Sequence, residues 1–574
     1  MFLKARSCSK FDDAEEFTGQ NLNDIAKLSK HTKKLFEDTL FPACNKSLGY
    51  QKNGTYPKIN WMRPSEIYSE PKFFISFPTR RDPVQGTITN CWLVSAISSL
   101  TQFPKIFEHV VPSGQSFDSS KGYFGAFYFR IWHDGKWSTV VVDDRLPILS
   151  KYQKPLGMTS RYYPKEFWCS LLEKAYAKLY GGYYNLEGGT ASEALIDLTG
   201  GISQKCNLKT YCKRINGSQT LFEYIKRSLS YHCMMGCSIS PQEGKYKAEE
   251  ILKNGLVVGH SYCILRCENV SWLGNHTDIL RLRNPWGNNV KWNGQWSSKD
   301  DRWNFVKADV RLRLSIGEQA DGEFWISYSD WINNYDVLEV CHLSPDSLSR
   351  ENLIIEGQEN VKEWNCRSYY GCWQRDISAG GRCDKPCTHG CRYWDNPCVS
   401  ILVNDIGVSR HTFVFCLSQI NKRLQSVDDP SERFEYIQLR LYAARILSNG
   451  EIIVKKNDYI DSSGPYVNRR DISFLVTLDN GWYILFASTY DPGIEGDFII
   501  RVFTDSDSSY RKQRTYDIPL GYTDESLSEY IEPSWNCCQH MYPVFSSISG
   551  VIKSIFSQSH KSDETTTTTD SNIS

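Results

Sequence analysis

The sequence has no excess of either charge and no long apolar run. Lysine and arginine together number 66, as do aspartate and glutamate, so the formal net charge is zero. A neutral chain lacks the basic surface that favours nucleic acid or acidic membranes. No run approaches the roughly 18 apolar residues of a spanning helix, and the first residues lack the apolar core of a signal peptide. We therefore expect a soluble, cytoplasmic protein that does not bind nucleic acid.

EF-hand loops and internal repeats are also missing from the sequence. No segment has the D-x-D-x-D-G form of an EF-hand calcium loop, and no repeat is visible. Cysteine, by contrast, is abundant, with 20 residues. In a cytosolic chain these are expected to be mostly reduced thiols, so their number does not by itself indicate a disulfide framework.

Hydrophobic patterning divides the chain into segments of different character. Residues 1–60 are mostly polar, with apolar residues at helical spacing that predict a surface helix packed on the next domain. Residues from 61 to 345 alternate helix-like and strand-like runs, which favours an α+β fold. From 355 to 505, short β-rich runs separated by turn residues predict an antiparallel β-sandwich. Residues 506–574 form a low-complexity tail.

Two local elements are predicted within the α+β part. A helix begins near Phe167 and is ended by the glycine pair at 181 and 182. A β-hairpin is predicted around Asp134 and Gly135, because this pair separates two β-rich runs and suits a tight turn.

The stretch QGTITNCWLVSAISSL, residues 85–100, contains a candidate nucleophile. Leu93, Ile97 and Leu100 fall on one side of a helix, which would begin at Cys91. Unpaired backbone N–H groups and the helix dipole at that position favour a thiolate. The alternative is that Cys91 is a packed, unreactive thiol, which is the usual role of a single cysteine.

Three further residues supply what a thiol nucleophile needs. His260 follows an apolar run and a glycine, and could take the proton of the thiol. Asn284, before a proline and a tryptophan, could orient the imidazole without adding charge, as in the Cys-His-Asn form of the triad. Gln85 could donate to an oxyanion beside the Cys91 N–H. Taken singly, His260 could equally be a core histidine and Asn284 a turn residue.

These segments together resemble the calpain family of intracellular cysteine proteases. The resemblance rests on QGTITNCWLVSAISSLT, GHSYCIL and LRLRNPWG, and extends through EFWCSLLEKAYAKLYGGY, DGEFWISYSDW and STYDPGIEGDFIIRVF, over roughly residues 60 to 505. It implies two papain-like protease subdomains, residues 61–200 with Cys91 and residues 201–345 with His260 and Asn284. A calpain-type β-sandwich follows at 355–505. Trp286 would cover the Asn–His pair, and no segment of this sequence matches the penta-EF-hand domain of conventional members.

The sequence departs from the family pattern just before the nucleophile. The usual Gly-Asp is Thr89-Asn90 here. The replacement of glycine matters if that position requires a positive φ or a close approach of substrate backbone. All chemical groups of the triad are nevertheless kept.

The resemblance also implies calcium ligands in each protease subdomain. In the first, the matching positions are Asp82 and Glu166, with Arg80 at the position that links the two sites. We expect this site to retain the capacity for calcium.

In the second subdomain, Asp321 and Glu323 are retained as metal ligands. The other two acidic positions fall at Lys291 and Ser298, which changes the local charge by about +3 relative to the family pattern. We expect no calcium there, and Lys291 to lie against Asp321 and Glu323 as a substitute cation. The alternative is that Lys291 points to solvent.

Two further segments have alternative interpretations. Six cysteines lie within residues 366–398 together with His389, and could form a zinc site or remain unmodified thiols. In the tail, residues 544–556 form an apolar helical face preceded by the pair Cys537-Cys538. This segment predicts either a weak, reversible membrane contact, with acylation of the cysteine pair, or a helix docked on the sandwich.

Three functions are compatible with these observations. The first is a calpain-like endopeptidase (a hydrolase) that performs limited proteolysis of protein substrates. The second is a catalytically weak regulatory or scaffolding protein that acts through its sandwich. The third is a transglutaminase, which also uses Cys followed by Trp, but orients its histidine with aspartate where this chain has Asn284.

Overall fold

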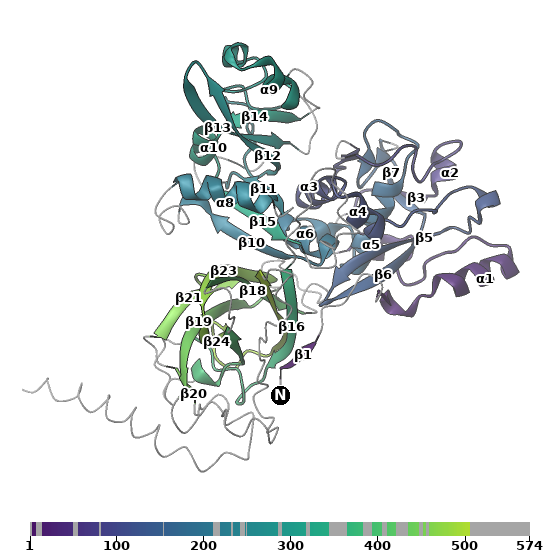
Figure 1. Ribbon diagram of the computed structural model, residues 1–574. Coiled ribbons are helices and arrows are strands. Elements are labelled where there is room, and N and C mark those ends of the chain that lie inside the picture. The colour runs from purple at the N-terminus through teal and green to yellow at the C-terminus, as the bar shows by residue number, and fades with distance from the viewer. Residues whose placement is uncertain are drawn as a thin grey trace, which may run out of the picture.

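The computed structural model describes most of the chain up to residue 505. The described residues are 3–6, 14–49, 56–79, 82–152, 154–209, 218–230, 233–241, 247, 250–284, 290–316, 322–343, 364–382, 393–403, 410–420, 434–446, 452–454 and 458–505. Three units are visible in Figure 1, coloured purple to blue, teal, and green to yellow along the chain.

The first unit surrounds its core with helices and three small sheets. Its helices are α1 (Leu22–Thr32), α2 (Pro64–Ile67), α3 (Cys91–Leu100), α4 (Pro104–Val110), α5 (Trp168–Leu179) and α6 (Ala191–Thr199). Its strands are β2 (Glu15–Glu16), β3 (Ile59–Met62), β4 (Pro83–Val84), β5 (Ala126–His133), β6 (Lys136–Asp143), β7 (Leu146–Leu149), β8 (Lys154–Pro155) and β9 (Thr159–Ser160). The sheets have the strand orders β2-β6-β5, β3-β7-β8 and β4-β9.

Sequence features account for the main elements of this unit. Helix α3 begins at Cys91 as predicted, and the apolar side chains of Leu93, Ile97 and Leu100 are fully buried. The predicted hairpin is also confirmed, since Asp134 and Gly135 both have positive φ, 47° and 87°, between β5 and β6. Helix α1 is the predicted surface helix and has no buried residue.

The second unit is a six-stranded antiparallel sheet with helices beside it. Its order is β10 (Ile202–Asn207), β15 (Val337–His342), β11 (Met234–Ser238), β12 (Ser261–Trp272), β13 (Asn275–Arg283) and β14 (Glu323–Ser327). The helices are α8 (Ser218–Ser230), α9 (Ala308–Arg313) and α10 (Tyr328–Asn334). Strands β12 and β13 form a long hairpin that extends away from the first unit (Figure 1).

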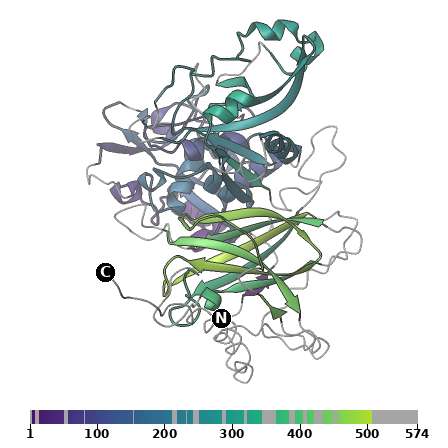
Figure 2. The same ribbon diagram turned by 90° about the vertical axis from the view of Figure 1, so that its left-hand side faces the viewer.

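The third unit is an antiparallel sandwich, as the sequence predicts. One sheet has the order β1 (Lys4–Arg6), β16 (Trp364–Trp373), β25 (Gly496–Asp505), β18 (Arg410–Gln419) and β23 (Asp471–Asp479). The other contains β17 (Cys398–Val403), β24 (Gly481–Thr489), β19 (Tyr436–Ile446) and β20 (Ile452–Ile453), with β21 (Tyr459–Ser462) and β22 (Val467–Asn468) also paired to β19. Figure 2 shows the two sheets face to face. Strand β1 shows that the chain start contributes to this unit.

Specific polar contacts join the units. Ser95 and Ser99 of α3 lie 3.2 and 3.1 Å from the Cys263 sulfur on β12. Arg470 of the sandwich forms an ion pair with the buried Asp197 of α6 at 2.8 Å. Helix α3 therefore packs directly against the strand that follows His260.

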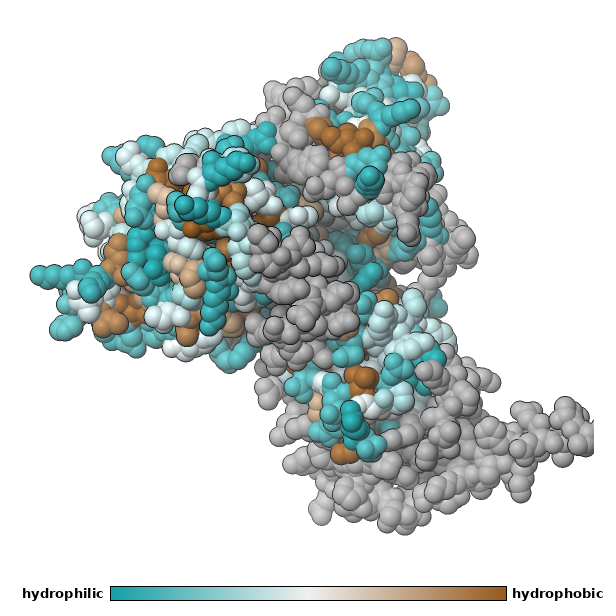
Figure 3. Space-filling view, turned by 180° about the vertical axis from the view of Figure 1, so that it is seen from behind, coloured by the Kyte–Doolittle hydropathy of each residue, from teal (hydrophilic) through white to brown (hydrophobic). Residues whose placement is uncertain are grey.

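The helices of the described residues and one face of the molecule can be compared for apolar character. No helix in this part of the chain is long and apolar enough to cross a bilayer. Seen from behind, the coloured surface is mainly polar, with apolar residues gathered in separate small groups (Figure 3).

Candidate active site

Cys91 is the first residue of α3 and is a half-buried free thiol. The preceding residue, Asn90, is the N-cap, but its side chain does not bond to the helix. Its carbonyl accepts from the N–H groups of Leu93 and Val94, at 3.0 and 3.2 Å. Cys91 thus lies at the positive end of the α3 dipole, the electrostatic setting that favours a thiolate.

Thr89, the first departure from the family pattern, is an exposed residue whose φ is not in the left-handed region. The backbone at this position therefore does not require glycine. Its carbonyl accepts from the Gly188 N–H at 3.4 Å.

His260 and Asn284 form a buried hydrogen-bonded pair. The His260 Nε2–H donates to Asn284 Oδ1 at 2.8 Å, and both residues have no exposed surface. The Asn284 amide group donates to the Val290 carbonyl at 2.9 Å, which fixes its oxygen toward the imidazole. With Nε2 engaged, Nδ1 is the ring nitrogen that can exchange a proton with a nucleophile.

The sheet explains why two residues 24 positions apart meet. His260 directly precedes β12 and Asn284 directly follows β13, and these strands are antiparallel neighbours. The start of one strand and the end of the other therefore lie at the same edge. Burial lowers the pKa of His260 to about 4, so its imidazole is neutral at pH 7.

Helix α3 packs beside this edge. Cys91 lies four residues before Ser95, and residues at this spacing share a helix face. Ser95 contacts Cys263, three residues after His260. The nucleophile and its candidate base thus lie on elements that pack against each other.

Gln85 lies in the loop before α3. Its Nε2 donates to the carbonyl of Ile88 at 2.9 Å, and the same carbonyl accepts from the Asn90 N–H at 2.9 Å. A primary amide has two N–H bonds, so one can hold the loop while the second points to a substrate oxygen.

A further residue at this site, Glu173 on α5, was missed in the sequence. Its Oε1 accepts from Asn90 Nδ2 at 2.6 Å, and its Oε2 accepts from the Met158 N–H at 2.6 Å. Burial raises the pKa of Glu173 to about 7. In the sequence, Glu173 is visible only as an acidic residue among the apolar positions of α5. The structure shows that every residue of this helix is buried.

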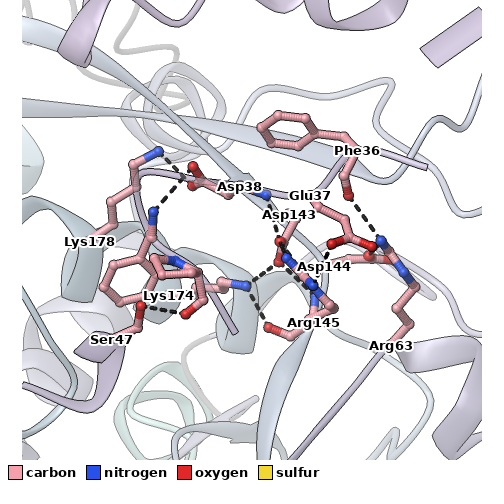
Figure 4. A network of polar contacts seen from close by, with 12 residues as sticks. Phe36, Glu37, Asp38, Ser47, Arg63, Asp143, Asp144, Arg145, Lys174 and Lys178 are labelled. Carbon is pink, nitrogen blue, oxygen red and sulfur yellow. Dashed lines mark hydrogen bonds and ion pairs between the residues drawn. The ribbon is translucent and has the colours of Figure 1, made fainter. Parts of the chain in front are cut away.

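Ion pairs anchor the other side of α5. Figure 4 shows Lys174 directed at Asp143 and Lys178 directed at Asp38, all from buried side chains. Asp143 also accepts from the Asp38 N–H at 2.8 Å and pairs with Arg145 at 2.6 Å. This network fixes the helix that carries Glu173.

The first predicted calcium site brings its two carboxylates together. Asp82 and Glu166 are both buried, and Asp82 contributes to raising the pKa of Glu166, after the larger effect of burial. Glu166 accepts from the Ile75 N–H at 2.7 Å and Ser160 Oγ at 2.9 Å. Two adjacent buried carboxylates are oxygen ligands of the kind that calcium prefers, but two carboxylates alone do not complete a calcium site. Arg80 lies outside the described residues.

At the second predicted site, the positive charge beside Glu323 comes from Arg281, whereas Lys291 was expected to supply it. Glu323 is fully buried and pairs with Arg281 at 2.8 Å. Within the described residues no ion pair joins Lys291 to Glu323, and the expected contact of Lys291 with Asp321 stays a prediction. Asp321 and Trp286 lie outside the described residues.

The residues of the second site do not fit calcium. Arg281 reaches Glu323 because the two lie diagonally across the neighbouring strands β13 and β14. The Arg281 guanidinium already supplies the positive charge that a calcium ion would bring to Glu323. Within the described ranges, no cluster of three or more His, Cys, Asp or Glu side chains could hold a metal at either site.

The cysteines are mostly free where they are described. Twelve are free thiols, whereas Cys366 is disulfide-bonded. Cys372 and Cys398 of the predicted cluster are free, but Cys383, Cys387 and Cys391 lie outside the described residues. The predicted tail helix and its cysteine pair, at 537–556, lie outside them as well.

Known proteins match the chain over both parts of this architecture. The model of the calpain family cysteine protease matches residues 36–342, and that of calpain large subunit domain III matches residues 369–503. Calpain-A of Drosophila melanogaster is 35% identical over 508 residues, 85% of this chain and 57% of that protein. Calpain-8 of Rattus norvegicus is 35% identical over 512 residues, 86% of this chain and 69% of that protein.

The chain therefore spans little more than half of Calpain-A. Among solved structures, the clostridial cysteine protease Cwp84 aligns at 12% identity and a TM-score of 0.19, covering 79% of this chain and 88% of that chain. That similarity is too low to support any argument about this fold.

Proposed function

Because this chain belongs to the calpain family of cysteine proteases, we propose that it is an endopeptidase that cleaves intracellular proteins at a limited number of bonds. Cys91 is the nucleophile, His260 the base and Asn284 the residue that orients the base. The main support is the 2.8 Å bond from His260 Nε2 to Asn284 Oδ1, at the strand edge against which α3 packs.

The reaction follows from the groups available. Cys91 Sγ attacks the carbonyl carbon of the scissile peptide while its proton passes to His260 Nδ1. The oxyanion is stabilised by the Cys91 N–H and the Gln85 amide. His260 then returns the proton to the leaving amine. Water, deprotonated by the same imidazole, hydrolyses the thioester and restores the thiol.

The lowered pKa of His260 determines how Cys91 and His260 are protonated before the reaction begins. An imidazole with a pKa of about 4 is neutral at pH 7, so it accepts the thiol proton as a general base. Because burial causes the shift, a preformed thiolate–imidazolium pair is disfavoured in this conformation. Any movement that solvates His260 raises its pKa and its strength as a base.

Calcium, where present, would be held by Asp82 and Glu166. It would neutralise two adjacent buried carboxylates and link the segment before Gln85 to the segment before α5. The second subdomain uses the Arg281–Glu323 pair in place of such an ion.

Proteolysis of an unfolded protein such as casein tests the proposal. Cys91→Ser should leave the fold intact and abolish cleavage, because a hydroxyl beside a neutral imidazole is a poor nucleophile at neutral pH. Cys44→Ala is the matched control, since Cys44 is an exposed free thiol far from α3 in the sequence, and should retain activity. Cleavage by the Cys91 variant would refute the assignment.

The alternative is a catalytically weak regulatory or scaffolding protein acting through its sandwich. Two departures from the family pattern favour this alternative: Thr89-Asn90 stands before Cys91, and the second calcium site is altered. No cleavage by the wild-type protein, with or without calcium, together with no alkylation of Cys91 by a thiol-directed epoxide, would establish this alternative.

A further inference from the structure

We propose that Glu173 is a positioning residue for Cys91, acting through Asn90 to set the direction of the Cys91 backbone N–H. This inference rests on the proposed function, since that N–H is the oxyanion donor. The two residues lie 83 positions apart, and the link between them is a single hydrogen bond between buried side chains.

Glu173 joins two loops beneath the active site. Through Oε1 it holds Asn90, at the end of the loop that carries Gln85. Through Oε2 it holds the Met158 N–H of the facing loop, and a Cβ added at Gly157 would collide with this carboxyl group. The two loops also contact each other directly, since the Thr87 N–H donates to the Leu156 carbonyl at 2.9 Å.

The Asn90 bond bears on the orientation of one peptide unit. The Cys91 N–H belongs to the peptide between Asn90 and Cys91, so its direction follows the backbone torsion of Asn90. On one side the Asn90 N–H is held by Ile88, and on the other its carbonyl is held by α3. The Glu173 contact fixes the side chain as well, and leaves this peptide little freedom to rotate.

Protonation of Glu173 exchanges donor and acceptor in its hydrogen bond with Asn90. As a carboxylate it accepts an N–H at each oxygen and needs no other partner. As a carboxylic acid it carries an O–H that needs an acceptor. Asn90 Oδ1, a buried atom with no hydrogen-bond partner within the described residues, becomes that acceptor when the amide rotates by about 180°.

Both protonation states are accessible near neutral pH, because burial raises the pKa of Glu173 to about 7. Two titratable groups sense its charge, the thiol of Cys169 on α5 and the phenol of Tyr183 after it. Burial raises the pKa of both, so both stay neutral in this range. Lys174, the next residue along α5, is directed at Asp143 in an ion pair between buried side chains.

The identity of residue 90 fits this arrangement. The family pattern has aspartate there, which would place a second carboxyl group 2.6 Å from Glu173 and force the pair to share a proton. Asparagine supplies a neutral donor instead. Asparagine at position 90, in place of the family's aspartate, therefore suits a neighbour, Glu173, that gains or loses a proton near neutral pH.

Glu173→Gln and Glu173→Ala separate positioning from simple packing. Glutamine can accept from Met158 and donate to Asn90 Oδ1, so it fixes the arrangement of the protonated form. When kcat for peptide cleavage is plotted against pH, we expect the wild type to change near pH 7 as Glu173 titrates. We expect Glu173→Gln to lack this change. Glu173→Ala should lower kcat at least tenfold and change KM less than twofold, with partial rescue by the glutamine variant.

Glu339→Gln is the matched control, because Glu339 is a buried carboxylate on β15 that pairs with Lys205, away from α3. It should keep the wild-type pH profile. The same change of kcat near pH 7 in Glu173→Gln as in the wild type, or a wild-type kcat in Glu173→Ala, would overturn the proposal.

A second readout separates this inference from the proposed function. The rate of Cys91 alkylation by iodoacetamide, followed by mass spectrometry from pH 5 to 9, does not require turnover. If wild-type protein does not cleave peptides, the proposed function fails. Glu173 remains a positioning residue if the alkylation profile of Glu173→Gln loses an inflection near pH 7, and is refuted as one if the profiles coincide.

Discussion

The buried carboxyl group of Glu173 makes a quantitative prediction about stability. Its pKa rises from 4.5 to about 7, and burial is the largest cause. One pKa unit corresponds to about 1.4 kcal/mol, so the shift corresponds to roughly 3 kcal/mol between the two protonation states. Because the folded protein binds the proton more tightly than the unfolded chain, the wild type loses this stability as pH rises from about 4.5 to 7.

Glu173→Gln removes the titration while keeping the shape of the side chain. The free energy of unfolding of this variant, relative to wild type, should therefore rise by up to roughly 3 kcal/mol between pH 4.5 and 7.5 and stay level above that. For a unit of 150–250 residues this is a relative increase in Tm of roughly 6–12 °C. The variant would be more stable at pH 8 while its catalytic profile has changed.

Differential scanning calorimetry at half-unit pH steps measures this directly. The transition to follow is that of the first unit, which contains α5, with Glu339→Gln as the control. If the Tm difference between Glu173→Gln and wild type does not change with pH, the carboxyl group is already ionised at low pH, and the reasoning about its burial is wrong.

Three further predictions concern the triad and the second subdomain. His260→Ala should abolish cleavage and slow Cys91 alkylation at pH 7, and an unchanged alkylation rate would show that His260 is not its partner. Gln85→Ala should lower kcat about 10²–10³-fold with little effect on alkylation, as expected for one oxyanion donor, and a wild-type kcat would remove it from the site. Arg281→Gln should destabilise the second subdomain by about 3–5 kcal/mol, since it removes the guanidinium that pairs with the buried Glu323 carboxylate. Calorimetric titration should then show calcium binding that the wild type lacks there, and a strong second site in the wild type would contradict the ion-pair argument.

Local patterns predicted the start of one helix and the position of one hairpin turn. The start of α3 at Cys91 follows from apolar spacing, and the β5–β6 turn follows from Asp134-Gly135. The meeting of His260 and Asn284 follows once their strands are neighbours, which the sequence indicates only through its resemblance to a family. These features depend on short segments whose chemistry is visible in the residues themselves.

The contacts that the sequence did not reveal are long-range or diagonal. Glu173 and Asn90 are joined only by the packing of α5 beneath the nucleophile loop, and an acidic residue on a helix is ordinarily solvated. Arg281 lies at none of the positions that match the family's calcium ligands, so the resemblance gives no sign of its pairing with Glu323. The register of β13 and β14, which brings it beside Glu323, is not readable from either strand alone.

The ion-pair network in Figure 4 also sets a limit on N-terminal trimming of the chain. Helix α1 itself has no buried residue, but a cut within it would remove Phe17, which packs against the core of the first unit, and Gln20, which bonds to Asp38 and Lys178. A cut beyond Asp38 would also strip Lys178 of its buried counter-ion and remove one of the donors to Asp143. A protease of this kind that processes its own N-terminus would therefore keep its fold only if cleavage stopped before this aspartate.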